Sequence, residues 1–150
     1  MSLDRSEAER LLGELIAPWV RDLRLSFETI DAGRVSVRMP FDERLTRIGG
    51  TVCGQALMAL ADTTMVFVVS SAIGEFRPMT TVSQSSNFMR PIAGADVIAE
   101  GRILRLGRTM AFGEVFIRAA GSEAPAVHVS SAYALIAEPA KAAAAPPSPH

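Results

Sequence analysis

The feature that most constrains the fold is a long apolar stretch, residues 51–74, with a single carboxylate, Asp62, near its centre. Its sequence, TVCGQALMALADTTMVFVVSSAIG, approaches the roughly 20 apolar residues that a membrane-spanning helix needs. A carboxylate in the middle of a bilayer is costly, and Gln55 with several threonine and serine hydroxyls adds further polar groups. The stretch therefore predicts a buried helix in a globular domain that makes no membrane contact.

The predicted core helix runs from about residue 53 to residue 73. Gly49 and Gly50 precede it, and Gly74 follows it in the position typical of a C-terminal cap. The run VFVV at 66–69 locally favours a strand. Residues 56–61, ALMALA, have no polar face, which predicts that the helix is buried on all sides.

An amphipathic helix is predicted near the N-terminus, over about residues 5–17. Ser6 and Glu9 have the spacing of a capping box, and Pro18 is expected to end the helix. We expect this helix to lie across the fold as a lid or brace. Its apolar face comprises Ala8, Leu11, Leu12, Leu15 and Ile16.

Five strands are predicted around the core helix. Residues 33–41, GRVSVRMPF, alternate apolar and polar side chains with the period of a half-buried strand. Gly, Pro and Ser signals then separate four more segments, which predict a meander of consecutive antiparallel strands. These segments are residues 79–91, 95–107, 108–121 and 124–138.

The order of elements predicts an α+β fold in which one antiparallel sheet wraps around one long helix. Residues 1–138 are expected to form a single domain, because this length can bury one core. Residues 139–150, PAKAAAAPPSPH, are rich in Ala and Pro, and we expect this tail to be disordered.

Composition excludes several classes of function. The chain has 15 Lys and Arg against 16 Asp and Glu, so it lacks the basic surface expected of a nucleic-acid-binding protein. Cys53 is the single cysteine, and the two histidines are His128 and the terminal His150, so neither an internal disulfide nor a Cys/His metal cluster is predicted. The charged N-terminus lacks the apolar core of a signal peptide, and a reducing, cytoplasmic location is expected.

Two longer motifs resemble the hotdog-fold acyl-CoA thioesterases, specifically the family related to phenylacetate degradation. The first is RIGGTVCGQALMALAD at 47–62, and the second is TVSQSSNFMRPIAGADVIAEGRILRLGRTMAFGEV at 81–115. The resemblance implies a hotdog fold and hydrolysis of an acyl-CoA to the free acid and coenzyme A. It also implies that no metal or redox cofactor takes part. Coenzyme A enters the reaction as part of the substrate.

The same resemblance implies two central roles. Asp62 would attack the thioester carbonyl or activate water, and the backbone N–H of Gly54 would polarise the carbonyl oxygen. Eight helical residues separate them, about 12 Å along the axis, which is too far for both to touch one carbonyl. We therefore expect antiparallel helices of two subunits to share each site, in a homodimer or a homotetramer of paired dimers.

Each of these residues also has a structural interpretation. Asp62 would serve as a structural acid bonded to Thr63, Thr64 or a neighbouring strand, and Gly54 would permit close helix packing. Thr81 matches a hydroxyl residue that orients water in the family, although threonine is also common in strands. The remaining matches are to positions that contact the coenzyme A tail, or else belong to a solvated face: Arg90, Gly107, Arg108 and Thr109.

Three positions at the substrate site depart from the family pattern. Cys53 replaces the histidine, Gln55 replaces the second glycine, and Arg47 replaces the upstream asparagine. These changes leave a second hypothesis open: a non-catalytic module that binds acyl-CoA or an acyl carrier protein. A nucleophilic role for Cys53 and a Ser/His/Asp triad with His128 are the disfavoured alternatives.

Overall fold

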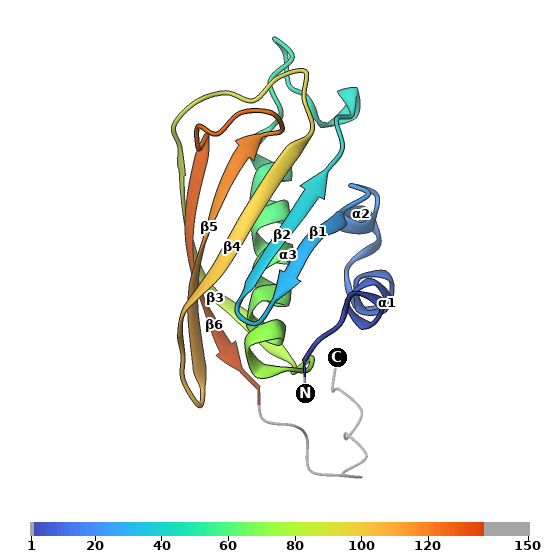
Figure 1. The fold of residues 1–150 in the computed structure, drawn as a ribbon. Helices are drawn as coiled ribbons and strands as arrows, with labels where there is room; N and C mark the ends of the chain where they lie inside the picture. Colours follow the sequence, from blue (N-terminus) through green and yellow to red (C-terminus); the bar gives the residue numbers. More distant parts are fainter. Residues whose placement is uncertain (1, 137–150) are drawn as a thin grey trace, which may run out of the picture.

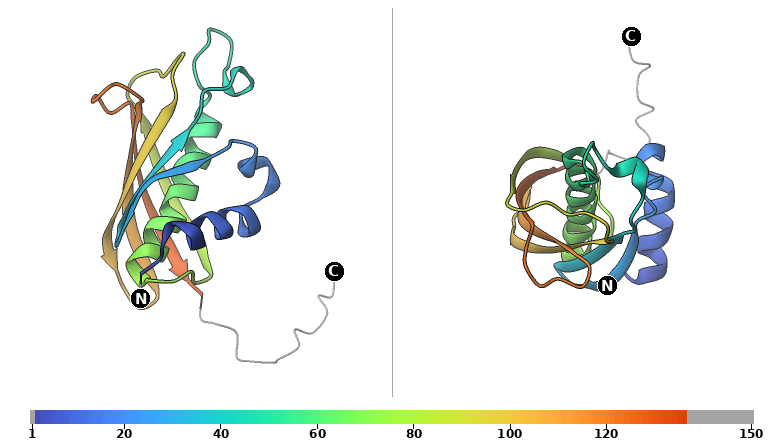
Figure 2. Two further views of the ribbon diagram at one scale, coloured as in Figure 1. Left: turned by 45° about the vertical axis from the view of Figure 1, so that its right-hand side comes forward. Right: turned by 90° about the horizontal axis from the view of Figure 1, so that it is seen from above.

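The computed structural model describes residues 2–136, in which one antiparallel sheet curves around one long helix (Figure 1). Seen from above, the helix α3 lies inside the curve of the sheet (Figure 2). The strand order across the sheet is β1-β2-β4-β5-β6-β3. This arrangement confirms the predicted α+β hotdog architecture. The proposed tail, residues 139–150, and the end of the proposed domain at residue 138 lie outside the described residues.

The elements follow one another in a simple order. Two short helices, α1 and α2, are followed by a β1–β2 hairpin, a 3-10 turn at Glu43–Leu45, α3 and four further strands. The bounds are α1 Arg5–Leu15, α2 Pro18–Arg21, β1 Ser26–Asp31, β2 Arg34–Met39, α3 Gly54–Ile73, β3 Met79–Phe88, β4 Val97–Leu106, β5 Met110–Ala119 and β6 Val127–Leu135.

The predicted meander is wrong for β3. Strands β4, β5 and β6 are neighbours in chain order, but β3 pairs only with β6, at the far edge of the sheet. Residues 89–96 cross the end of the sheet and bring β4 beside β2, where Val97 pairs with Met39 (Figure 1). The position beside β4 that a meander would give to β3 is therefore occupied by β2. Strand β3 pairs instead with β6, the last strand in the chain.

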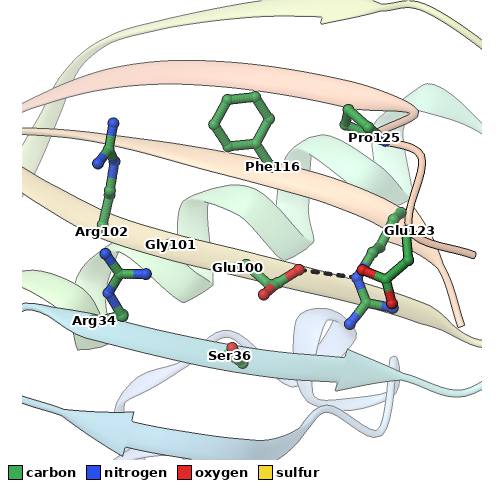
Figure 3. A pocket seen from close by; sticks show the side chains of 9 residues that line it. Arg34, Ser36, Glu100, Gly101, Arg102, Phe116, Glu123 and Pro125 are labelled. Carbon is green, nitrogen blue, oxygen red and sulfur yellow. Dashed lines mark hydrogen bonds and ion pairs between the residues drawn. The ribbon is translucent and has the colours of Figure 1, made fainter.

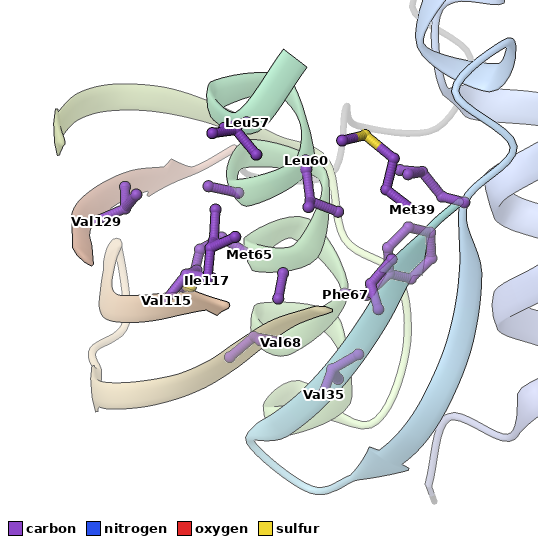
Figure 4. Packing of buried hydrophobic residues seen from close by; sticks show 14 of the residues in the cluster. Val35, Met39, Leu57, Leu60, Met65, Phe67, Val68, Val115, Ile117 and Val129 are labelled. Atoms are coloured by element: carbon purple, nitrogen blue, oxygen red, sulfur yellow. The ribbon is translucent and has the colours of Figure 1, made fainter. Parts of the chain in front are cut away.

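Helix α3 forms the core because most of its faces are covered by the sheet. Leu60, Met65 and Val68 are fully buried and pack with residues of β2, β5 and β6 such as Val35, Ile117 and Val129 (Figure 4). The strand preference of residues 66–69 is overridden, because burial of this helical face outweighs local propensity. Among the described residues, α3 is the helix with the length and hydropathy to cross a membrane, and 67 % of its most apolar window is buried inside the fold.

The ends of α3 are set by local chemistry. Gly74 takes a left-handed conformation, φ 99°, and its N–H donates to the carbonyl of Ser70 at 2.8 Å. A glycine adopts this conformation without the strain of a Cβ, so the predicted C-terminal cap is confirmed. The helix begins at Gly54, with Cys53 as an N-cap whose side chain makes no capping hydrogen bond.

One stripe of α3 is not covered by the sheet, which corrects the prediction that the helix is buried on all sides. Met58 is 40 % exposed, Gln55 is also exposed, and Ala59, Asp62 and Val66 are half-buried. Spacings of three and four residues place these side chains along one helix face. The uncovered stripe therefore runs from the start of α3 past its middle.

The N-terminal helix differs from the prediction at its first turn. Asp4, rather than Ser6, is the N-cap, and its carboxylate accepts a hydrogen bond from the N–H of Glu7 at 2.8 Å. The capping-box prediction is therefore wrong, because the helix begins at Arg5 and its free N–H groups are capped by Asp4, two residues before Ser6. Pro18 does not end α1 but begins α2. The helix braces β1, since the guanidinium of Arg5 donates to the carbonyls of Phe27 and Glu28.

Candidate active site

Asp62 lies on the uncovered stripe of α3, and its carboxylate is held from two strands. Its Oδ1 accepts a hydrogen bond from the hydroxyl of Tyr133 on β6 at 2.6 Å and another from Oγ1 of Thr81 on β3 at 2.9 Å. Oδ2 accepts no hydrogen bond from any residue that the structure describes. The half-buried acid therefore has one oxygen fixed and one oxygen available.

Tyr133 is a site residue that the sequence did not reveal. Its side chain is fully buried, and its hydroxyl also lies 3.3 Å from the backbone carbonyl of Asp62. Burial, and then the charge of Asp62, raise the pKa of the Tyr133 hydroxyl well above its usual range. The tyrosine consequently remains a protonated hydrogen-bond donor at any working pH.

Strand β3 lies alongside the uncovered stripe of α3. Thr81 bonds Asp62, the amide of Gln84 donates to the carbonyl of Met58 at 3.2 Å, and the ring of Phe88 lies next to Gly54. A Cβ added at Gly54 would be 3.4 Å from Cζ of Phe88. The strand thus borders the helix from its N-terminus to beyond the acid.

A hollow of about 410 Å³ surrounds the start of α3. The loop before the helix is anchored there, because the N–H of Val52 donates to the carbonyl of Ile92 at 2.9 Å and that of Cys53 to the carbonyl of Leu45 at 2.8 Å. Gly54 occupies the first helical position, so its N–H has no intrahelical partner. The lining brings together three predicted site residues, Arg47, Gly54 and Arg90, with Phe88 and Met89 among their neighbours.

A second, smaller hollow of about 160 Å³ lies one helical turn beyond Asp62. Val66 is four residues after Asp62 on the same helix face, and Met79 is two residues before Thr81 on β3. The lining is apolar and comes from α1, α3, β3 and the segments that follow the two helices: Leu11, Leu15, Ile16, Val66, Phe67, Phe76 and Met79. An uncharged group attached to a carbonyl at Asp62 would find an apolar surface here.

Three predicted residues lie away from the hollow at the start of α3. Gly107, Arg108 and Thr109 form the turn between β4 and β5, at the opposite end of the sheet from the N-terminus of α3 (Figure 1). The N–H of Gly107 closes this turn on the carbonyl of Met110 at 2.7 Å. Within one chain, this turn and the hollow with Arg47 and Arg90 do not form one site.

Cys53 and Gln55 flank Gly54 at the start of the helix. Cys53 is half-buried and Gln55 is exposed. Gln55 continues the uncovered stripe toward Met58, and Cys53 is nine residues before Asp62. Neither side chain takes part in the hydrogen bonds that hold the acid.

The outer face of the sheet carries a further hollow, of about 340 Å³, where most of the charges are paired (Figure 3). Arg118 bonds Glu100 at 2.9 Å across two strands of this face. Arg102 and His128 both bond Glu114, at 2.5 and 2.8 Å. His128 therefore belongs to a hydrogen-bonded cluster around Glu114, on the face that turns away from Asp62. Over residues 2–136, no group of three or more His, Cys, Asp or Glu could hold a metal ion.

Comparison with known proteins gives one family. The model of the thioesterase superfamily matches residues 49–126. A "putative esterase" of Thermoplasma volcanium is 33 % identical over 107 residues, which cover 66 % of this chain and 74 % of that protein. A second "putative esterase", from Thermoplasma acidophilum, is 28 % identical over 97 residues, 65 % of this chain and 73 % of that protein.

The fold has solved counterparts. The crystal structure of a "putative thioesterase" from Silicibacter sp. TM1040 superposes with a TM-score of 0.81 and 30 % identity, over 90 % of this chain and 93 % of that one. Thioesterase superfamily member 2 of zebra fish superposes with a TM-score of 0.79 at 21 % identity, over 89 % and 98 % of the two chains. The second similarity concerns the fold alone.

Proposed function

Because the chain belongs to the thioesterase superfamily, we propose that it hydrolyses an acyl-CoA thioester to the free acid and coenzyme A. Thioester hydrolysis is the general activity that its esterase and thioesterase relatives support. The observation that carries the proposal is the carboxylate of Asp62, held by two hydroxyls on one oxygen and open at the other. A carboxylate in that state is ready to accept a proton or to attack a carbonyl.

The proposed site is shared between two subunits. Gly54 and Asp62 are eight helical residues apart, about 12 Å along the axis, so one carbonyl cannot reach both in one chain. An antiparallel pair of α3 helices, crossing at Met58 midway between them, would place Asp62 of one subunit opposite Gly54 of the other. The uncovered stripe of α3 supports this arrangement, since it exposes Met58 and leaves Asp62 and Val66 half-exposed.

In the proposed reaction, Asp62 takes a proton from water while the water oxygen attacks the thioester carbonyl carbon. The negative charge on the carbonyl oxygen is stabilised by the N–H of Gly54 at the positive end of the helix dipole. The C–S bond then breaks, and the coenzyme A thiolate takes up the proton from Asp62. If Asp62 instead attacks directly, the same donor stabilises the same charge and water releases the acyl group afterwards.

The two hollows support an assignment of the two ends of the substrate. We assign the acyl group to the apolar hollow beside Val66 and Met79, next to Asp62. Arg47 and Arg90, in the hollow around Gly54, are assigned to the phosphates of coenzyme A, because guanidinium groups bind phosphate in bidentate fashion. The reaction requires no metal or redox cofactor, and we propose a cytoplasmic location.

A second candidate function rests on the residues around Gly54. The family histidine, second glycine and asparagine are replaced by Cys53, Gln55 and Arg47. A protein that had lost the groups supporting water and substrate would still bind acyl-CoA or an acyl carrier protein without hydrolysing it. This non-catalytic module is the alternative that the experiment must separate.

The test is release of free thiol from a panel of acyl-CoA substrates by the wild-type protein and by Asp62→Asn. Asparagine keeps the shape of the side chain but neither accepts the proton nor attacks, so turnover should fall by roughly 10²- to 10⁴-fold. Binding of coenzyme A should persist. Cys53→Ala is the matched control and should retain activity; its inactivation would instead indicate a thiol mechanism. Binding of acyl-CoA without turnover of any panel member would establish the non-catalytic alternative.

A further inference from the structure

We propose that Tyr133 is a positioning residue of the hydrolytic site, whose hydroxyl occupies Oδ1 of Asp62 and so makes Oδ2 the oxygen that reacts. This inference rests on the proposed function of Asp62. It goes further by assigning separate roles to the two carboxylate oxygens and by placing a residue of the last strand in the machinery.

The lone pairs of Oδ1 are already used in hydrogen bonds. A carboxylate oxygen has about two lone-pair positions for hydrogen bonds. On Oδ1 of Asp62 both are filled, by Tyr133 at 2.6 Å and by Thr81 at 2.9 Å. A proton could bind Oδ1 only if one of these bonds were broken. Oδ2 is therefore the oxygen left for water or for the carbonyl carbon.

The tyrosine that donates to Oδ1 is held rigidly by its surroundings. Tyr133 is fully buried on β6, an inner strand of the sheet. It pairs with Thr81 on β3 on one side and with Ala111 on β5 on the other. Its ring is consequently fixed by packing, and the short O–H···O⁻ bond transmits that position to the carboxylate. Thr81 lies on the edge strand β3 and is exposed, so it is the less constrained of the two donors.

Tyr133 acts as a hydrogen-bond donor and not as a base. A tyrosine hydroxyl next to a reacting centre can itself serve as a general base when it is ionised. Here burial and the adjacent charge of Asp62 raise the pKa of Tyr133, so that the hydroxyl stays protonated. Its contribution is the hydrogen bond that it donates.

The experiment compares Tyr133→Phe with Asp62→Asn, using the full chain and the best substrate of the acyl-CoA panel. Phenylalanine keeps the buried ring and removes only the hydroxyl. We expect kcat to fall roughly 10- to 100-fold with KM nearly unchanged, because the reacting oxygen loses its fixed position while substrate contacts remain. In the Asp62→Asn background the same change should cause no further loss, since Tyr133 acts through the acid.

Two further variants separate positioning from a purely structural role. Val129→Ala, on the same strand and fully buried, should lower the melting temperature and leave kcat unchanged. Thr81→Val removes the second hydrogen-bond donor to Oδ1, at an exposed position, and should lower kcat less than Tyr133→Phe does. This variant keeps the test possible if Tyr133→Phe folds poorly.

The outcomes are distinct. Wild-type kcat in Tyr133→Phe together with an inactive Asp62→Asn would overturn the positioning role and leave the proposed function intact. A loss of kcat in Tyr133→Phe that multiplies with that of Asp62→Asn would also overturn it, because the effect would not pass through the acid. Full turnover by Asp62→Asn would overturn the proposed catalytic role of Asp62, although acyl-CoA hydrolysis itself would stand, and with that role it would overturn this inference.

Discussion

Among single residues, Glu114 on β5 is a carboxylate on the outer face of the sheet that two side chains hold, Arg102 and His128. Hydrogen bonds from His128, and then from Arg102, lower the pKa of its carboxyl below the usual value of 4.5. The folded state thus favours the ionised form of this group. Its contribution to the free energy of unfolding is complete above the unfolded pKa, and it is lost as the pH falls through the lower folded pKa.

The first prediction at this scale concerns acid stability. Glu114→Gln should lower the melting temperature at pH 5.5, where the carboxylate of the wild-type protein is ionised and paired. The difference between the two proteins should shrink as the pH is lowered toward 3, because protonation removes the same pairing from the wild type. Melting curves followed by circular dichroism measure both effects. Glu123→Gln, at an exposed carboxylate that forms no ion pair within residues 2–136, is the control and should give no such trend.

The sequence revealed only part of the candidate site, for a physical reason. Asp62 stood out because it is an ionisable group inside an apolar stretch, and Gly54 and Thr81 followed from the family resemblance of the two motifs at 47–62 and 81–115. Tyr133 gave no local signal, since its β6 segment reads as an ordinary strand. Its role depends on a contact between residues 71 positions apart, which only the paired sheet creates.

Among the elements, α3 packs tightly against β5 at Gly113. A Cβ added to Gly113 on β5 would clash with the side chain of Met65 and would lie 2.8 Å from the backbone carbonyl of Arg102. Met65 is fully buried, so its side chain has little room to move. The absence of a side chain at residue 113 is what lets the core helix approach the sheet.

The second prediction concerns the close contact between α3 and β5 at Gly113. Gly113→Ala should lower the free energy of unfolding by about 1–3 kcal/mol, the usual range for an overpacked core. Gly13→Ala is the matched control, since Gly13 lies in α1 with no atom within 4 Å of an added Cβ. That change should stabilise the protein by about 0.5–1 kcal/mol. Urea unfolding of both variants gives the two values, and equal effects would contradict the packing argument.

Elements with a strong apolar pattern of their own were predicted correctly. The weakly patterned strand β1 was missed, and the position of β3 in the sheet, which depends on contacts with other strands, was predicted wrongly. The alternation in β2 and the apolar length of α3 are properties of the chain itself. Strand β1, Ser26–Asp31, was missed because Phe27 is its only buried residue and most of its other side chains are exposed. The place of β3 beside β6 was also missed, since strand order depends on how the connections cross the sheet.

The proposed shared site requires a second subunit. Met58 lies where the two α3 helices are proposed to cross, and it is 40 % exposed in the single chain. A carboxylate there would face its own copy across the two-fold axis, with both charges partly desolvated. This residue is therefore the place where the interface is most sensitive to charge.

The third prediction follows from that position. Met58→Asp should split the pair of subunits that meet through α3, giving monomers from a dimer or smaller assemblies from a tetramer of paired dimers. Turnover should be abolished, because each subunit keeps Asp62 but lacks the partner's Gly54. Light scattering at micromolar concentration, with turnover assayed in parallel, measures both. Leu104→Asp, which places the same charge at an exposed residue of β4, should keep assembly and activity. A wild-type monomer with full activity would contradict the shared site.

The pairing of β3 with β6 also fixes the order in which a newly made chain can mature. Strand β3 leaves the ribosome with α3, but its sheet partner is the last strand, and residues 89–126 must be made in between. At about 5–20 residues per second, β3 waits roughly a few seconds for that partner. During this interval Asp62 lacks its bond from Tyr133. The proposed site is therefore incomplete in the nascent chain, because Asp62 is present before the strand that holds its carboxylate. The proposed activity can begin only after β6 has been made and has paired with β3.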